Sequence, residues 1–122
     1  MKRDMELIRK LLLHIEDHYA YDELHSPEIA IDGYSEQQIG YHLKLMADGG
    51  LIDVLDATAM GDSTYYFAID GMTWYGHEFL DSVRDEGVWT NVKAALKPVG
   101  TVSFEVLKNL AVAYATRMVG LP

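Results

Sequence analysis

The 122-residue sequence contains no cysteine, which excludes disulfide bonds, thiolate catalysis and metal sites built on cysteine. It also lacks the short motifs that mark a nucleophilic serine, a phosphate-binding loop or a dinucleotide-binding turn. Without such a motif, no residue stands out as a nucleophile or as a general base. We therefore predict that the protein is not an enzyme, that it needs no cofactor, and that it has no catalytic, cofactor-binding or metal-binding residues.

Long hydrophobic runs are also missing. Near the N-terminus the longest run is Leu11 to Leu13, far shorter than the roughly 20 apolar residues that a membrane-spanning helix needs. Charged residues from Lys2 to Lys10 interrupt any apolar segment of a signal peptide. The sequence thus predicts no membrane partner and a cytoplasmic location.

Positive charge is scarce in the middle of the chain. Residues 11–83 contain fourteen Asp and Glu, only one Lys, which is Lys44, and no Arg, so their formal charge is −13. The remaining residues carry +4, which gives the net charge of −9. Surfaces that bind DNA need Lys and Arg to neutralise phosphates. The charge distribution therefore weighs against a nucleic-acid partner.

Apolar periodicity and capping residues predict five helices and three strands. The helices are expected at about residues 4–18, 35–48, 73–83, 85–97 and 103–119, and the strands at 28–31, 51–57 and 64–69. The clearest start signal is the capping box Ser35-Glu36-Gln37-Gln38. The predicted fold class is mainly α with a small β hairpin, or wing. We expect one domain over residues 1–122, with a winged-helix core at 1–83 and C-terminal helices at 84–122 that pack on this core or on a partner.

Several motifs, in the same order along the chain, resemble those of the DUF2513 family of bacterial and phage proteins. They are MKRDMELIRK at residues 1–10, Gly33-Tyr34-Ser35 to Tyr41-His42-Leu43, Gly50-Leu51-Ile52, and TWYGHEFLD at residues 73–81. The sequence is also similar, more loosely, to the YjcQ-type winged-helix proteins of prophages. The resemblance implies a winged-helix fold and a phage or prophage setting. It implies no established activity and no catalytic residues.

Two histidines near the N-terminus are candidate metal ligands. His14 and His18 are four residues apart, so both can face one ion, with Asp22 or His25 as a third ligand. We favour the alternative that this pair is solvated, and we expect His42 and His77 to be packed with backbone or carboxylate partners. Three large aromatic residues recur at helical spacing, so we expect them in the core: Trp74, Phe79 and Trp89.

The candidate interaction surface is the outer face of the 35–48 helix together with the wing. Its residues are Gln37, Gln38, Tyr41, Lys44, Asp48, Asp56 and Asp62. The formal charges on the helix part cancel and the wing is acidic, which favours a basic protein partner over DNA. A small acidic phage protein of this kind could act on a host nucleic-acid-binding or defence factor.

The alternative function is a DNA-binding transcriptional regulator that uses the Ser35–Asp48 helix. Gln37, Gln38, Tyr41 and Lys44 would then contact bases. Cations at the two ends of the chain would have to gather into one strip: Lys2, Arg3, Arg9, Lys10, Arg84, Lys93, Lys97, Lys108 and Arg117. A homodimer is a further possibility, because the last helix has apolar residues to spare, namely Val106, Leu110, Ala113 and Met118.

Overall fold

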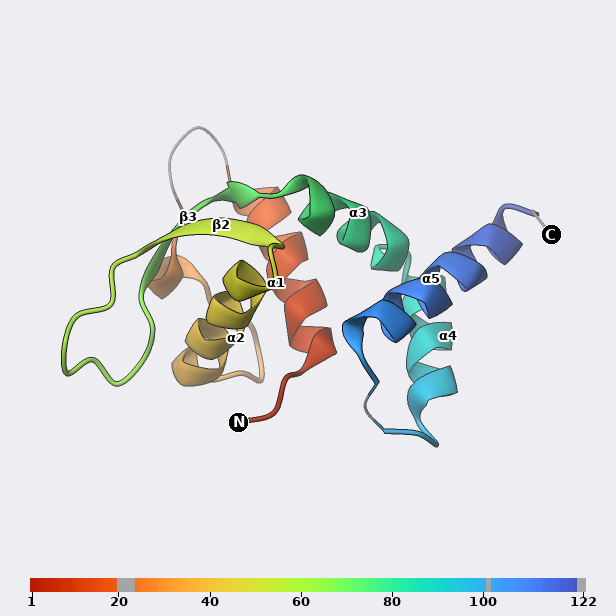
Figure 1. Ribbon diagram of the computed structural model, residues 1–122, viewed down its shortest axis with the longest axis horizontal. Coiled ribbons are helices and arrows are strands. Elements are labelled where there is room, and N and C mark those ends of the chain that lie inside the picture. Colours follow the sequence, from red (N-terminus) through yellow and green to blue (C-terminus); the bar gives the residue numbers. More distant parts are fainter. Residues whose placement is uncertain (20–23, 101, 121–122) are drawn as a thin grey trace. The chain divides into compact units, whose positions relative to one another are not determined.

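The computed structural model describes residues 1–19, 24–100 and 102–120. Along this part of the chain lie α1 (Met5–His18), β1 (Leu24–His25), the 3-10 helix η1 (Ser26–Glu28), α2 (Glu36–Asp48), β2 (Ile52–Asp56), β3 (Phe67–Met72), α3 (Trp74–Val83), α4 (Glu86–Leu96) and α5 (Phe104–Met118). Figure 1 shows this order along the ribbon. The predicted class, mainly α with a small β hairpin, is confirmed.

Two compact units divide the chain, Met1–His77 and Glu78–Pro122. The boundary falls within α3, six residues before the end of the predicted core. The first unit holds α1, α2 and the whole sheet, and the second holds α4 and α5. The expectation of one domain with C-terminal helices packed on the core or on a partner stays a prediction.

Five helices begin at the capping residues that the sequence predicts. The side chain of Asp4, Ser35, Thr73, Asp85 or Ser103 accepts a hydrogen bond from the backbone N–H three residues later. Such a bond satisfies one of the donors that a helix leaves unpaired at its start. These predictions succeed because the interaction spans only one turn of chain.

The sheet has three antiparallel strands in the order β1-β3-β2. In the hairpin, Ile52 lies opposite Met72 and Asp56 lies opposite Phe67, with an irregularity at Asp53/Val54. The predicted hairpin is therefore present, although β3 begins three residues later than expected. The loop between the strands stays paired for one further step, since the Ala57 N–H donates to the Tyr66 carbonyl oxygen at 2.8 Å.

The predicted strand at residues 28–31 is wrong. The strand lies earlier, at Leu24–His25, and Ser26–Glu28 form η1, with Pro27 in its first turn. Proline fits a helical first turn because its fixed φ suits it and its missing N–H is not needed there. In addition, the Ser26 hydroxyl oxygen accepts a hydrogen bond from the Phe67 N–H at 2.9 Å, which ties η1 to β3.

Each unit has its own apolar core. In the first unit α1 packs on α2 and on β3, while α2 packs on β2; Figure 1 shows the two helices beneath the sheet. The buried residues of these helices include Leu7, Leu11, Ile15, Ile39, Leu43 and Met46. In the second unit α4 packs on α5, and the Phe79 and Phe104 rings lie 4.5 Å apart. The core of the first unit fixes which face of α2 remains available.

Candidate interaction surface

The start of α2 is fixed by a complete capping box. The Ser35 hydroxyl oxygen accepts a hydrogen bond from the Gln38 N–H at 3.1 Å, and the Gln38 side-chain oxygen accepts one from the Ser35 N–H at 2.8 Å. Losing a cap of this type typically costs about 1 kcal/mol. The Gln38 amide, which the sequence places on the candidate surface, is thus engaged in holding the helix start. Gln37 beside it is exposed.

The inner face of α2 is held by a buried histidine. His42 is 1% exposed. Its Nε2 accepts a hydrogen bond from the Asp4 N–H at 2.8 Å, and its Nδ1 lies 2.8 Å from the Gln38 carbonyl oxygen. Because a backbone N–H can only donate, the ring hydrogen must sit on Nδ1 and be donated to Gln38. The expectation of a packed histidine with backbone partners is confirmed for His42.

Asp4, whose N–H donates to His42, makes further contacts through its side chain. Its carboxylate accepts hydrogen bonds from the Leu7 N–H and, at 3.1 Å, from the Tyr34 hydroxyl. Partial burial first, and then the neighbouring Asp4 charge, raise the pKa of the Tyr34 hydroxyl above its usual 10.0. Hydrogen bonds therefore connect the start of α1 to α2 and to Tyr34 before it, and they fix which face of α2 points to the core.

The outer face of α2 carries Tyr41, Lys44 and Asp48. The Lys44 Nζ donates to the Asp48 carboxylate at 2.8 Å, one turn along the helix. This hydrogen bond, followed by the Asp48 charge, raises the pKa of Lys44. Exposed ion pairs of this kind add little to stability. Their importance here is electrostatic, because the one Lys or Arg of residues 11–83 has its charge cancelled by an adjacent carboxylate.

Tyr65 also lies on this face, which the sequence does not predict. The Lys44 Nζ lies 5.8 Å from the centre of the Tyr65 ring, which is itself stacked on Phe67. The close approach depends on Gly40, since a Cβ at this position would lie 2.6 Å from the Thr64 hydroxyl oxygen and 3.0 Å from the Tyr65 carbonyl oxygen. A glycine inside an amphipathic helix was the available signal for such a contact.

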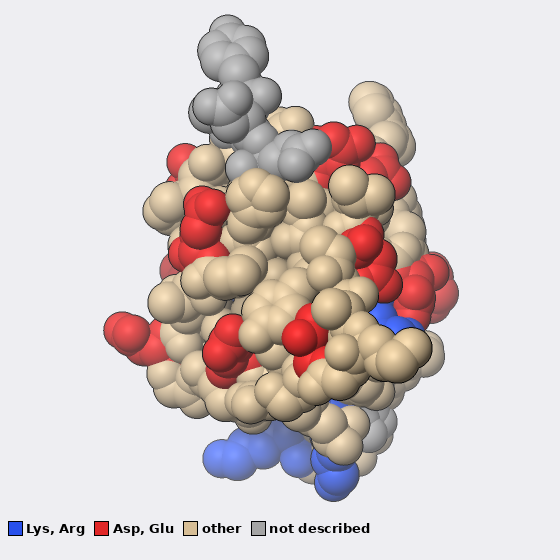
Figure 2. Space-filling view, turned by 90° about the vertical axis from the view of Figure 1, so that its left-hand side faces the viewer, with Lys and Arg blue, Asp and Glu red and all other residues tan. Residues whose placement is uncertain are grey.

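The two acidic residues of the wing have local roles. The Asp56 carboxylate accepts a hydrogen bond from the Thr58 N–H at 2.8 Å, and the Asp62 carboxylate accepts one from the Ala59 N–H at 2.6 Å. Hydrogen bonds from Thr58 lower the pKa of Asp56. Both side chains are exposed and shape the loop. Figure 2 shows acidic side chains spread over the face of the molecule on this side.

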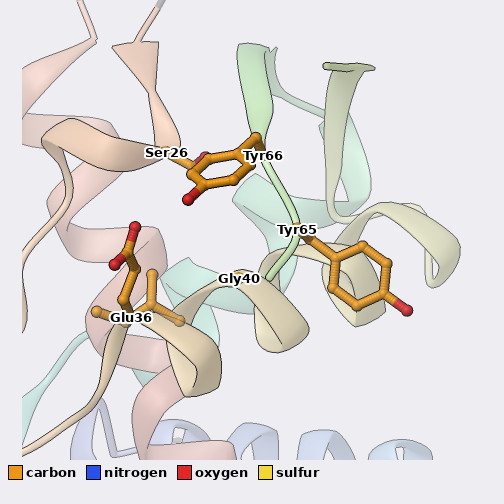
Figure 3. Close-up of a pocket in the computed structure, with 6 residues that line it drawn as sticks. Ser26, Glu36, Gly40, Tyr65 and Tyr66 are labelled. Atoms are coloured by element: carbon orange, nitrogen blue, oxygen red, sulfur yellow. The ribbon is translucent and has the colours of Figure 1, made fainter. Parts of the chain in front are cut away.

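A small depression lies beside this surface. It is lined by Ser26, Glu36, Ile39, Gly40, Tyr65 and Tyr66, and its volume of about 10 Å³ is room for roughly one water molecule. Figure 3 shows the Glu36 carboxylate and the Tyr66 ring pointing toward one another, while the Tyr65 ring points away. A depression of this size does not accommodate an organic substrate.

Comparison with known proteins shows to which family the chain belongs. Residues 2–103 match the family model described as "Hypothetical protein (DUF2513)". The chain belongs to the DUF2513 family. A relative of similar length is the "Uncharacterized protein" of Haemophilus influenzae (strain ATCC 51907 / DSM 11121 / KW20 / Rd), with 29% identity over 119 residues, covering 97% of this chain and 98% of the relative. No solved structure matches. The resemblance of the sequence to the DUF2513 family is confirmed.

Two residues of this DUF2513 protein contradict the sequence-based expectation of burial. Trp74 is 81% exposed, whereas Phe79 and Trp89 are in the core as predicted. His77 is exposed as well. Both lie on α3, whose first turn is held by the hydrogen bond from the Thr73 hydroxyl to the Gly50 carbonyl oxygen and by the close approach of Gly76 to Leu51. The apolar periodicity of this helix therefore does not decide which aromatic residue is covered.

The histidine pair of α1 is in contact. The His14 and His18 rings stack with centroids 3.9 Å apart, and the His18 Nδ1 lies 2.9 Å from the His14 carbonyl oxygen. Partial burial, and then the nearby His18, lower the pKa of His14. His25 lies on β1, and Asp22 is outside the described residues. Within residues 1–19, 24–100 and 102–120, no three metal-ligating side chains come together.

The basic ends of the chain belong to different units. Arg9 is only 4% exposed, so it is not available to a DNA phosphate, and the Lys10 Nζ lies 5.7 Å from the centre of the Tyr34 ring. Lys2 and Arg3 are exposed in the first unit, whereas the cations from Arg84 onward that the DNA-binding alternative needs are in the second unit. Across the described helices, none is long and apolar enough to cross a bilayer.

Proposed function

We propose that this DUF2513 protein is a non-enzymatic, acidic protein-interaction module with a winged-helix core. Its contact surface is the outer face of α2, with Gln37, Tyr41, Lys44 and Asp48, together with Asp56 and Asp62 of the wing. The observation that carries the proposal is the Lys44–Asp48 ion pair at 2.8 Å, which cancels the charge of the only Lys or Arg in residues 11–83.

The winged-helix assignment is supported by the order of the elements. Helix α1, strand β1, helix α2 and the β2–β3 hairpin follow one another, and β3 lies between β1 and β2. In this arrangement α2 takes the position of a recognition helix and the hairpin that of the wing. The capping box at Ser35 and the buried His42 present α2 from a fixed backbone, which suits a contact surface.

The choice of a protein partner follows from electrostatics. Most of the affinity of a DNA-binding surface comes from cations that neutralise phosphates. The proposed surface has no net positive charge on α2 and two exposed carboxylates on the wing, so a polyanion is repelled while a basic protein is attracted. In a phage or prophage setting, a host nucleic-acid-binding or defence factor is a partner with the required basic surface.

A photo-crosslinking residue placed at Tyr41 tests the proposal in cells. We expect one or a few discrete protein adducts from Tyr41. The matched control carries the same residue at Asn91, an exposed position of α4, and should give none of these adducts. Adding Asp56→Lys and Asp62→Lys to the Tyr41 probe should reduce the yield, because the charge that attracts the partner is reversed. If the adducts from the two positions are the same, the surface is wrongly assigned.

DNA binding is the second candidate, and it is favoured by the position of α2 in the element order. Gln37, Tyr41 and Lys44 would then meet the major groove. The test is a gel-retardation assay at low salt with mixed-sequence duplexes. DNA binding predicts retardation that weakens in Lys44→Ala, with a salt slope lower by about one. If no duplex is retarded by the native protein, this candidate is eliminated.

A further inference from the structure

Trp74 is a large apolar side chain that is exposed to solvent, and packing within the protein does not explain this exposure. The chain has two tryptophans, and Trp89 is 2% exposed while Trp74 is 81% exposed. A tryptophan offers a large apolar surface and an electron-rich ring face, and it is among the residues that contribute most at protein interfaces. An exposed tryptophan therefore points to a partner when its position is fixed and its environment is selective.

The backbone that carries Trp74 is fixed from three directions. The Thr73 N–H donates to the Leu51 carbonyl oxygen at 3.0 Å, and the Thr73 hydroxyl donates to the Gly50 carbonyl oxygen. The same hydroxyl accepts a hydrogen bond from the Gly76 N–H at 2.9 Å. A Cβ at position 76 would overlap the Leu51 carbonyl oxygen, so only glycine permits this packing. The indole is presented from a rigid turn, and binding would order little more than its own side chain.

The environment of this turn is acidic. Asp48 lies two residues before Gly50, to which the Thr73 hydroxyl is bonded, and Asp53 pairs in register with Gly71. Asp70 is the next residue on β3. All three carboxylates are exposed, and residues 45–83 contain no Lys or Arg. β2 and β3 thus each contribute one carboxylate to the strand ends that precede α3, whereas the Asp48 carboxylate of α2 is paired with Lys44.

We propose that Trp74 anchors a surface that binds a cationic segment of a partner protein, with an Arg side chain over the indole face and further cations near Asp53 and Asp70. This inference rests on the proposed protein-interaction function and names the class of partner. A guanidinium group fits because it stacks on an aromatic ring and bonds to carboxylates at its edge. The exposed carboxylates of the two strands that precede Trp74 disfavour a nucleic acid and a purely apolar peptide.

The direct test measures the binding of fluorescein-labelled nona-arginine by anisotropy at low salt. We expect Trp74→Ala to weaken binding about fivefold, in line with a cation–π contact at an exposed site. The matched control is Met60→Ala, which removes another exposed apolar side chain, at the tip of the wing, and should bind as the native protein does. Circular dichroism verifies that both variants are folded. Equal affinities of the two variants would overturn the proposal.

Tryptophan fluorescence locates the contact. In the Trp89→Phe variant Trp74 is the sole reporter, and nona-arginine should change its emission while nona-glutamate should not. The double variant Asp53→Asn and Asp70→Asn should weaken nona-arginine binding about threefold and reduce its dependence on salt. A Trp74 emission change caused by duplex DNA alone, or by raising the protein concentration alone, would assign the surface to a nucleic acid or to a second copy and would overturn the proposal.

The outcome separates this inference from the proposed function. Discrete Tyr41 adducts together with Trp74-independent peptide binding would leave the interaction module standing and remove the Trp74 anchor. Trp74-dependent peptide binding without Tyr41 adducts would support the anchor and remove α2 from the contact surface.

Discussion

The two faces of α2 differ in what holds them. On the inner face Leu43 is fully buried and His42 is bonded to the backbone of both Asp4 and Gln38. On the outer face Tyr41 is half-buried and Lys44 forms an exposed ion pair with Asp48. One helix thus carries stability on one side and charge on the other. Substitutions on the inner face should affect folding, and substitutions on the outer face should affect binding.

The largest effect is expected from Leu43→Ala. The side chain is fully buried, so truncation removes apolar contacts and leaves a cavity. We expect a loss of about 3 kcal/mol in the free energy of unfolding, the middle of the range for such substitutions. Urea denaturation followed by circular dichroism measures it. A loss below about 1 kcal/mol would show that the inner face of α2 is not a packed core.

Gly40→Ala sharpens the comparison at the border of the two faces. The added methyl group would meet the Thr64 hydroxyl oxygen at 2.6 Å and the Tyr65 carbonyl oxygen at 3.0 Å, so α2 and the segment before β3 must separate. We expect a loss of about 2 kcal/mol from overpacking. Gly33→Ala is an instructive contrast, because no atom lies within 4 Å of its Cβ position and only its φ of +87° opposes the substitution.

Alkaline pH should weaken the link that orients the inner face. The Tyr34 hydroxyl donates to Asp4, and its pKa is raised above 10.0 in the folded state. The corresponding stability is fully present below pH 10.0 and is lost as the pH rises through the raised pKa, because the folded state holds the proton more tightly. Tyr34→Phe should abolish this part of the pH dependence and cost about 1 kcal/mol at neutral pH.

The smallest effect on folding is expected from Lys44→Ala. Its ion pair with Asp48 is exposed, so the thermal midpoint of unfolding should be essentially unchanged. The yield of protein adducts from position 41 should change instead, because the negative charge of Asp48 is then no longer compensated by Lys44. A marked fall in the midpoint would contradict the division between the two faces.

Several features of the candidate surface could be predicted because they depend on residues close together in the chain. The capping box at Ser35 and the burial of Leu43 follow from spacings of three and four residues. The membership of Tyr65 could not be predicted, since it depends on Gly40 allowing another segment to approach α2. The predicted strand at 28–31 failed because apolar alternation over four residues is a weak signal, and Pro27 with Ser26 favoured a helical turn tied to β3.

By itself the sequence determined the helix starts, the mainly α fold class, membership of the DUF2513 family and the shortage of positive charge in residues 11–83. Only the tertiary structure decided that Tyr65 lies beside Lys44, and that Trp74 faces solvent while Trp89 is buried. The physical reason is the distance along the chain over which each interaction acts. Caps and helical periodicity act within one or two turns, whereas the exposure of a side chain depends on which distant segment packs against it.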